Sequence, residues 1–209
     1  MKIGFEAKRA FTNGTGLGHY SRTLISSLAK YFVEDDYYLF TPKQTNLFKI
    51  DSIENIKTII PTHFPASIFR SAWRSSWVKK DLVKLGIDIY HGLSHEIPFG
   101  IQNTSVKSVV TMHDLIFERN PEQYNPIDVK IYRKKFKYAC VNANHIIAIS
   151  HQTKNDLIDF YNIICMIFYG RFKHSVNFFN HRLYRAHRKL KLHTVYVLGV
   201  IISSYYVTV

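Results

Sequence analysis

Two clusters of residues in this 209-residue sequence combine side-chain types and spacings that suit chemistry. Gly14, Gly16 and Gly18 follow a short apolar run and precede a helical period. Glycines at such a junction let the backbone turn tightly and bring bare N–H groups, together with the helix dipole, toward an anion. His113 and Asp114 directly follow another apolar run, and a histidine there can donate to a sugar hydroxyl or a phosphate, or polarise a leaving group near neutral pH.

Both clusters also have structural explanations, which the spacing leaves open. The glycines fit a plain tight connection as well as they fit a phosphate-bearing ligand. Taken alone, His113 fits a residue that caps a loop beside a sheet better than it fits a site residue. The glycines form no dinucleotide fingerprint, because the third would fall at Ser21, and the Gly-Lys-Ser/Thr of a Walker loop is missing. Dehydrogenases and nucleoside triphosphatases are therefore excluded.

Three further polar residues are candidates for simpler roles. His91 and His95 are four residues apart, which is a metal-ligand spacing only on a helix, and Gly92 and the nearby proline favour a loop. We therefore expect no metal site. Ser150 precedes a helical pattern, and we expect it to cap that helix rather than to bind a phosphate.

Short β-branched runs alternate with amphipathic helical patterns over residues 1–161, which is typical of a mainly parallel α/β sheet with helices on both faces. The predicted strands cover residues 2–7, 37–41, 56–60, 87–91, 106–112 and 145–149. Four helices are predicted: one after Gly18, one over 66–85 that Gly86 ends, one after Pro126, and one from Ser150 to Tyr161. In the first helix we expect one buried stripe, formed by Tyr20, Leu24, Leu28 and Phe32. In the second, Trp73 and Trp77 share one face. In the third, we expect Ile127, Ile131, Phe136 and Ala139 to face inward and Arg133, Lys134, Lys135 and Lys137 to face outward.

Charge divides the sequence into two parts. The formal net charge is +13, yet residues 162–209 hold seven Lys/Arg and no Asp or Glu, while residues 1–161 hold the other 21 bases and all 15 acids. We predict one domain over 1–161 and a separate, irregular basic tail over 162–209. Two cysteines and an N-terminus without a signal-peptide pattern favour a cytoplasmic protein. The basic face of the helix after Pro126 is expected to be solvated, with peripheral contact to the inner membrane face as the alternative.

Four stretches together resemble the N-terminal domain of a family 4 glycosyltransferase of GT-B architecture, the group that includes mannosyltransferases of polysaccharide synthesis. They are residues 16–21 (GLGHYS), 88–92 (DIYHG), 109–115 (VVTMHDL) and 146–150 (IIAIS). The resemblance covers residues 1–161 in order and spacing, and it implies a Rossmann-like sheet that forms one half of a GT-B fold.

The resemblance also implies roles for particular residues. The loop residues Gly16, Leu17, Gly18, His19 and Tyr20 would line the cleft near the donor diphosphate and the acceptor, and His113 would contact the donor sugar as a catalytic residue. His19 stands where the family more often has arginine. In such enzymes a second domain with a Glu-x7-Glu motif holds most of the nucleotide-sugar and neutralises the leaving diphosphate. Neither a metal nor another cofactor is then expected, and transfer is expected to retain configuration.

The implied reaction is hexosyl transfer, with GDP-mannose as the donor and a saccharide or lipid-linked saccharide as the acceptor. After Tyr161 the family pattern stops, and the basic run leaves no room for a second domain. We expect a frameshift or premature end near codon 162 and an incomplete enzyme that is inactive alone. The alternative is a non-enzymatic binding protein, either a partner subunit for a separate donor domain or a basic module for nucleic acid or anionic lipid. We expect no specific nucleic-acid partner.

Overall fold

A parallel seven-stranded sheet forms the centre of the described part of the chain, which comprises residues 1–50, 53–163 and 167–169 of a computed structural model. The strand order is β3-β2-β1-β4-β5-β6-β7. The strands are β1 Lys2–Glu6, β2 Asp36–Phe40, β3 Ile56–Ile59, β4 Ile89–Gly92, β5 Lys107–Met112, β6 His145–Ala148 and β7 Ile167–Tyr169. The first six confirm the predicted strands to within two residues at each end, and the α/β class is confirmed.

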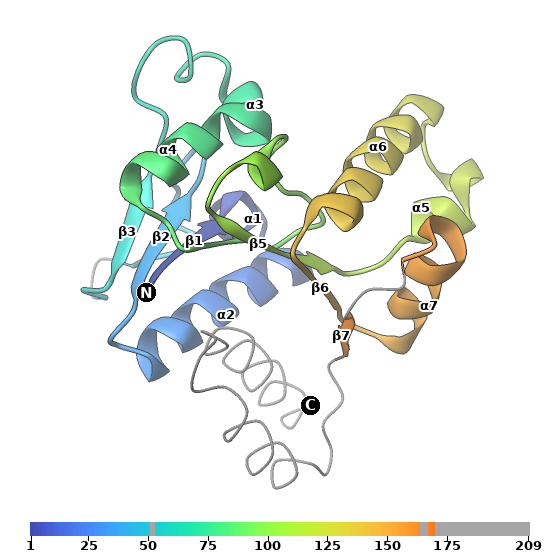
Figure 1. Cartoon of the computed structure of the whole chain (residues 1–209), viewed down its shortest axis with the longest axis horizontal. Helices are drawn as coiled ribbons and strands as arrows, with labels where there is room; N and C mark the ends of the chain where they lie inside the picture. The colour runs from blue at the N-terminus through green and yellow to red at the C-terminus, as the bar shows by residue number, and fades with distance from the viewer. Residues whose placement is uncertain (51–52, 164–166, 170–209) are drawn as a thin grey trace, which may run out of the picture.

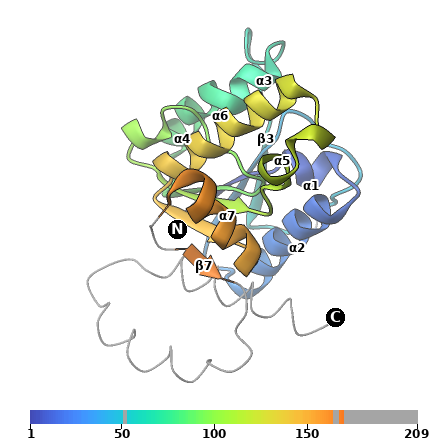
Figure 2. The ribbon, with the colours of Figure 1, turned by 90° about the vertical axis from the view of Figure 1, so that its right-hand side faces the viewer.

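Helices cover both faces of this sheet, with α4 and α6 on one side and α2 on the other (Figures 1 and 2). The helices are α1 Lys8–Thr12, α2 Gly16–Tyr31, α3 Arg70–Ala72, a π-helical turn Trp73–Trp77, α4 Val78–Leu85, α5 Ile116–Arg119, α6 Pro126–Asn142 and α7 His151–Tyr161. On the α2 side, Leu24, Ile25 and Leu28 pack against buried Phe5 and Leu39 of the sheet. On the other side, the core is built from Trp73, Leu82, Phe136 and Ala139 among others.

Local sequence signals explain where several helices begin and end. Ser150 accepts a hydrogen bond from the N–H of Thr153 at 3.0 Å, which confirms it as the N-cap of α7. Asn125 caps α6 in the same way by accepting from the N–H of Ile127 at 2.9 Å. Gly86 has φ +67° and ends α4, because a left-handed residue at this position carries no strain when it is glycine. That prediction is also confirmed.

The predicted inner face of α6 is only half right. Phe136 and Ala139 are buried, but Ile127 and Ile131 have exposed fractions of 68% and 45%. The helix instead buries Val129 and places Phe136 edge-on to Phe117. Because a helix turns about 100° per residue, Ile127 and Ile131 then lie on the side opposite to this stripe.

Two other expectations need correction. The helix predicted over 66–85 begins at Arg70 and contains the π-helical turn. Gly16 and Gly18 lie in the first turn of α2 rather than in a loop.

The end of the chain is only partly described. The predicted tail over 162–209 lies outside the described residues, apart from 162–163 and 167–169. Strand β7 falls within it and pairs in parallel with β6, so the sheet continues past residue 161. No helix in the described ranges has the length and apolar character needed to cross a membrane.

Candidate functional site

The carboxyl ends of the parallel strands bring the two clusters of the sequence together. The Tyr20 hydroxyl lies 3.1 Å from Thr111 Oγ1, near the end of β5. The Tyr20 ring meets the His113 ring edge-on, with centroids 4.8 Å apart. The first turns of α2 and the residue after β5 therefore share one edge of the sheet, which is where ligands bind in open α/β folds.

The N-terminus of α2 is open. Thr15 is the N-cap but its side chain makes no capping bond to the helix, because its hydroxyl and its N–H both donate to Asn13 Oδ1 at 2.7 Å. Among the described residues, the N–H groups of Gly16, Leu17 and Gly18 donate to no side chain and to no backbone carbonyl outside the helix. The first turn also contains no acidic residue. Gly18 is buried, whereas Gly16 is exposed and Leu17 half-buried, so the amides of these two residues and the positive end of the helix dipole are available to an anion.

The three glycines differ in what the structure requires of them. None has a left-handed φ, so backbone conformation does not require glycine at these three positions. A Cβ on Gly18 would lie 1.8 Å from the Asn13 carbonyl oxygen, so close packing of α2 on the preceding loop requires glycine. A Cβ on Gly14 or Gly16 would meet nothing within 4 Å. The packing of the described residues therefore gives no reason for glycine at position 16.

His113 is fixed by three hydrogen bonds. Its Nε2 lies 2.9 Å from the Leu93 carbonyl oxygen, which can only accept, so Nε2 carries the proton. Its backbone N–H donates to His95 Nε2 at 3.0 Å, and its carbonyl accepts from the Thr153 hydroxyl at 2.8 Å. Burial lowers the pKa of His113, and the bond to Leu93 only partly offsets this. The ring is therefore neutral at pH 7 and retains Nδ1 as an acceptor.

Two buried histidines support this arrangement from behind. His91 Nε2 lies 2.9 Å from Thr111 Oγ1, and burial lowers the pKa of His91 to about 3, with a smaller contribution from the repulsion that a protonated His113 would exert. His95 stacks on Phe136 with ring centroids 4.4 Å apart, and burial lowers its pKa to about 3 as well. His95 has φ +67°, and its N–H donates to the Thr111 carbonyl while its ring accepts from His113. Such a strained residue persists where its surroundings hold it.

His91 and His95 lie on a strand and its following loop, as the sequence indicated. In the described ranges, no group of three His, Cys, Asp or Glu side chains is arranged to hold a metal ion.

A network of charges beside this edge was not predicted from the sequence. Arg74 of the π-helical turn lies 3.5 Å from Glu6 Oε1 and 2.9 Å from Glu96 Oε2, and Lys135 of α6 lies 3.2 Å from Glu96. Burial would raise the pKa of Glu96, but Arg74 and Lys135 together hold it below its usual range. Glu6 is the last residue of β1 and Glu96 lies in the loop after β4, so both were visible in the sequence as charged residues near strand ends. Arg74 gave no such signal, because only the tertiary fold places its helix there.

Two hollows on the surface of the described residues lie away from this edge. A hollow of about 530 Å³ lies on the outside of α6, and a smaller one of about 150 Å³ lies at residues 44–49. Neither includes Gly16 or His113.

Comparison with known proteins gives the class of this chain. Residues 15–165 match the model of Glycosyltransferase Family 4, so the chain belongs to that family. It is similar in structure to a crystal structure of a glycosyltransferase from Rickettsia africae ESF-5, with 16% sequence identity and a TM-score of 0.45. That likeness covers 80% of this chain and 42% of the Rickettsia chain, so this chain spans less than half of its length. No curated protein matches the chain.

Proposed function

We propose that this chain forms the acceptor-side wall of a hexosyltransferase cleft, in which mannose passes from GDP-mannose to a saccharide or lipid-linked saccharide. The observation that carries the proposal is the contact between Tyr20, in the second turn of α2, and His113 after β5. This contact puts an open helix N-terminus and a neutral histidine on one edge of the sheet. Family membership supports a transferase.

The two parts of the edge have complementary roles in this proposal. The amides of Gly16 and Leu17 face the donor diphosphate, whose negative charge grows as the glycosidic bond breaks, and Gly18 lets the turn pack closely behind them. The open space beside Gly16 lets a phosphate oxygen approach the backbone. His113 offers Nδ1 to a hydroxyl of the donor sugar, since its Nε2–H is occupied by Leu93.

The remaining members of the predicted set have different surroundings. His19 is exposed on α2, where it is free to contact an acceptor. The Tyr20 hydroxyl is close to Thr111, so we propose that Tyr20 positions His113 through ring contact rather than by binding substrate. We also propose that transfer retains configuration and needs no metal, as the family resemblance implies.

We further propose that these 209 residues need a second, donor-binding domain for turnover and are located in the cytoplasm, where nucleotide-sugars are used. The free, buried Cys140 fits a reducing compartment. Nucleic-acid binding by the basic tail would rest on residues outside the described part of the chain.

Mixing the purified chain with GDP-mannose and a mannosyl acceptor tests both parts of the proposal. Ligand-observed NMR should detect weak binding that His113→Ala reduces, whereas product formation should be negligible without a donor-domain protein. Absence of any nucleotide-sugar or acceptor binding would refute the site. Clear turnover by the chain alone would refute only the need for a second domain.

A further inference from the structure

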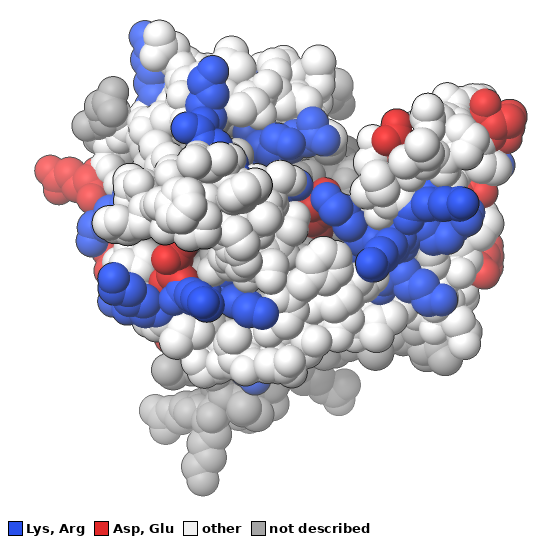
Figure 3. Space-filling view, turned by 90° about the horizontal axis from the view of Figure 1, so that it is seen from above, with Lys and Arg blue, Asp and Glu red and all other residues white. Residues whose placement is uncertain are grey.

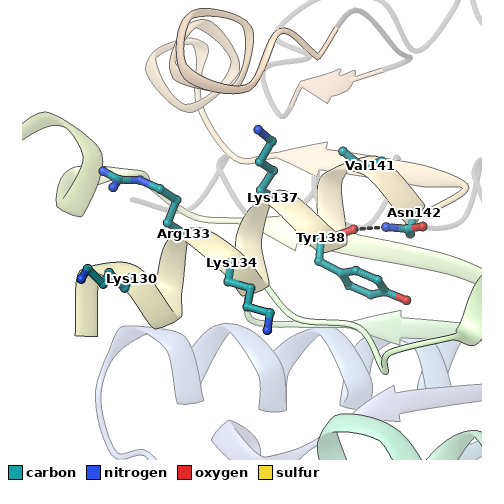
Figure 4. Close-up of a pocket in the computed structure, with 7 residues that line it drawn as sticks. All are labelled: Lys130, Arg133, Lys134, Lys137, Tyr138, Val141 and Asn142. Carbon is teal, nitrogen blue, oxygen red and sulfur yellow. Dashed lines mark hydrogen bonds between the residues drawn. The ribbon is translucent and has the colours of Figure 1, made fainter. Parts of the chain in front are cut away.

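The exposed side of α6 combines free cations with aliphatic side chains. We call this side the outer face of α6, and it consists of Ile127, Lys130, Ile131, Lys134, Lys137 and Val141. Viewed from above, Lys and Arg side chains gather over α6 (Figure 3). The hollow of about 530 Å³ is lined by this helix alone, and Lys134 and Lys137 extend to its two sides (Figure 4).

The lysines of the outer face differ from the other cations of the helix. Arg133 forms bonds of 2.6 to 3.1 Å with Glu118, and Lys135 is paired with Glu96. In the described part of the chain, Lys130, Lys134 and Lys137 have no carboxylate within ion-pair distance. Their charges are therefore uncompensated, and a ligand of this face must be an anion.

The apolar members decide which anion fits. Ile127, Ile131 and Val141 have exposed fractions of 68%, 45% and 63%, although the core lies on the opposite side of the helix. Phosphate groups of a nucleic acid would contact the lysines but would gain nothing from these aliphatic side chains. At a bilayer surface, lysines meet anionic headgroups while aliphatic groups enter the headgroup and acyl boundary.

Charge also argues against two other occupants of the outer face, namely the C-terminal stretch of residues 162–209 and a second copy of the chain. The sequence contains no Asp or Glu after Asp159, so the C-terminal stretch cannot neutralise the outer face. A second copy of the chain carries a net charge of +13 and would be repelled. We propose that the outer face of α6 docks on an anionic phospholipid bilayer, an activity independent of sugar transfer.

Co-sedimentation of the full chain with vesicles tests this proposal. The vesicles contain phosphatidylglycerol and phosphatidylcholine, or phosphatidylcholine alone. The variant combines Lys130→Gln, Lys134→Gln and Lys137→Gln, because glutamine keeps helix propensity. Each lysine near an anionic surface contributes about five-fold to partitioning, so the variant should bind on the order of 100-fold more weakly.

A matched control removes three exposed lysines elsewhere, by Lys43→Gln, Lys49→Gln and Lys107→Gln. Both triple variants have the same net charge and leave the basic C-terminal stretch intact, so their difference isolates the outer face. The control should lose only a few-fold in partitioning, and unchanged circular dichroism should verify both folds. Equal losses in the two variants would overturn the proposal.

A second variant tests the apolar contribution without changing charge. Ile127→Ser with Ile131→Ser should weaken binding to the anionic vesicles about tenfold, because two aliphatic side chains leave the boundary region. Val33→Ser with Leu47→Ser, which changes two exposed side chains elsewhere, should have no effect. The proposal would be overturned if the Ile127 and Ile131 substitutions left vesicle binding unchanged while duplex DNA binding depended on the three lysines. The outer face would then be a nucleic-acid binding surface.

Discussion

Alanine substitutions at Gly16 and Gly18 should have opposite effects on stability, although the residues are only two positions apart. A Cβ at position 18 would lie 1.8 Å from the Asn13 carbonyl oxygen, which is backbone and cannot move aside cheaply. Overpacking of this kind costs about 1–3 kcal/mol, and the alanine gain in a helix returns roughly 0.5–1 kcal/mol. We therefore expect Gly18→Ala to lower the free energy of unfolding by about 1–2 kcal/mol.

The Cβ of Gly16→Ala would meet no neighbouring atom, so no packing cost should offset the stability that alanine adds to a helix. The variant should be as stable as the parent chain or more stable by up to about 0.5–1 kcal/mol. Its methyl group would occupy the open space beside the first-turn amides of α2. Losing one charge-assisted hydrogen bond there, at about 1.5–3 kcal/mol, should weaken pyrophosphate binding on the order of tenfold or more.

Urea denaturation followed by circular dichroism measures the two stabilities. Amide chemical-shift titration with inorganic pyrophosphate measures binding, and it reads weak affinities directly. Gly14→Ala is the matched control, because it also meets nothing within 4 Å but precedes the helix. A Gly16→Ala variant that binds pyrophosphate as tightly as the parent chain would refute the proposed role of this turn.

Three further outcomes are expected. The neutral, buried His91 and His95 have pKa values of about 3, whereas unfolded histidine titrates near 6.5, so the unfolded state binds more protons below that pH. Urea denaturation should then show stability falling as pH drops from 7 to 5.5, with a slope approaching about 1.4 kcal/mol per pH unit for each residue. Nitrogen-15 NMR should find the ring proton on Nε2 of His113 and on Nδ1 of His95. Arg74→Met should lower the free energy of unfolding by about 3 kcal/mol, because it leaves the buried Glu6 carboxylate without its cationic partner and with only the hydrogen bond from Ser94.

Controls make each of these outcomes decisive. A parent chain equally stable at pH 7 and 5.5 would contradict the buried neutral histidines. A protonated Nε2 on His95 would contradict its role as acceptor for the N–H of His113. Arg74→Lys keeps the charge and should recover part of the stability, and a loss below about 1 kcal/mol in Arg74→Met would contradict the buried pairing.

Periodicity and capping were sufficient to predict most of the sheet and the ends of its helices. Ser150 and Gly86 act through their own backbone neighbours, so the sequence contains their roles. The faces of α6 were harder, because Ile127 and Ile131 match the same spacing as a core stripe. Which apolar stripe turns inward depends on the Phe136 contacts with Phe117 and His95, and these are tertiary.

In the candidate site, too, some residues could be predicted from the sequence and others depend on tertiary contacts. Gly16 and His113 could be singled out because strand ends and glycines mark positions along the chain. The support from His95 could not be found in this way. Its hydrogen bond to His113 depends on the parallel register of β4 against β5 and on a left-handed backbone at a residue that is not glycine.

Helix α6 lies between its exposed outer face and the edge of the sheet that contains His113. Its inner side presents Phe136, whose ring stacks on His95, and His95 accepts the N–H of His113. Only two contacts thus separate the helix from the histidine at the strand tip. A tilt or rotation of α6, whatever its origin, would be transmitted mechanically to the orientation of the His113 ring.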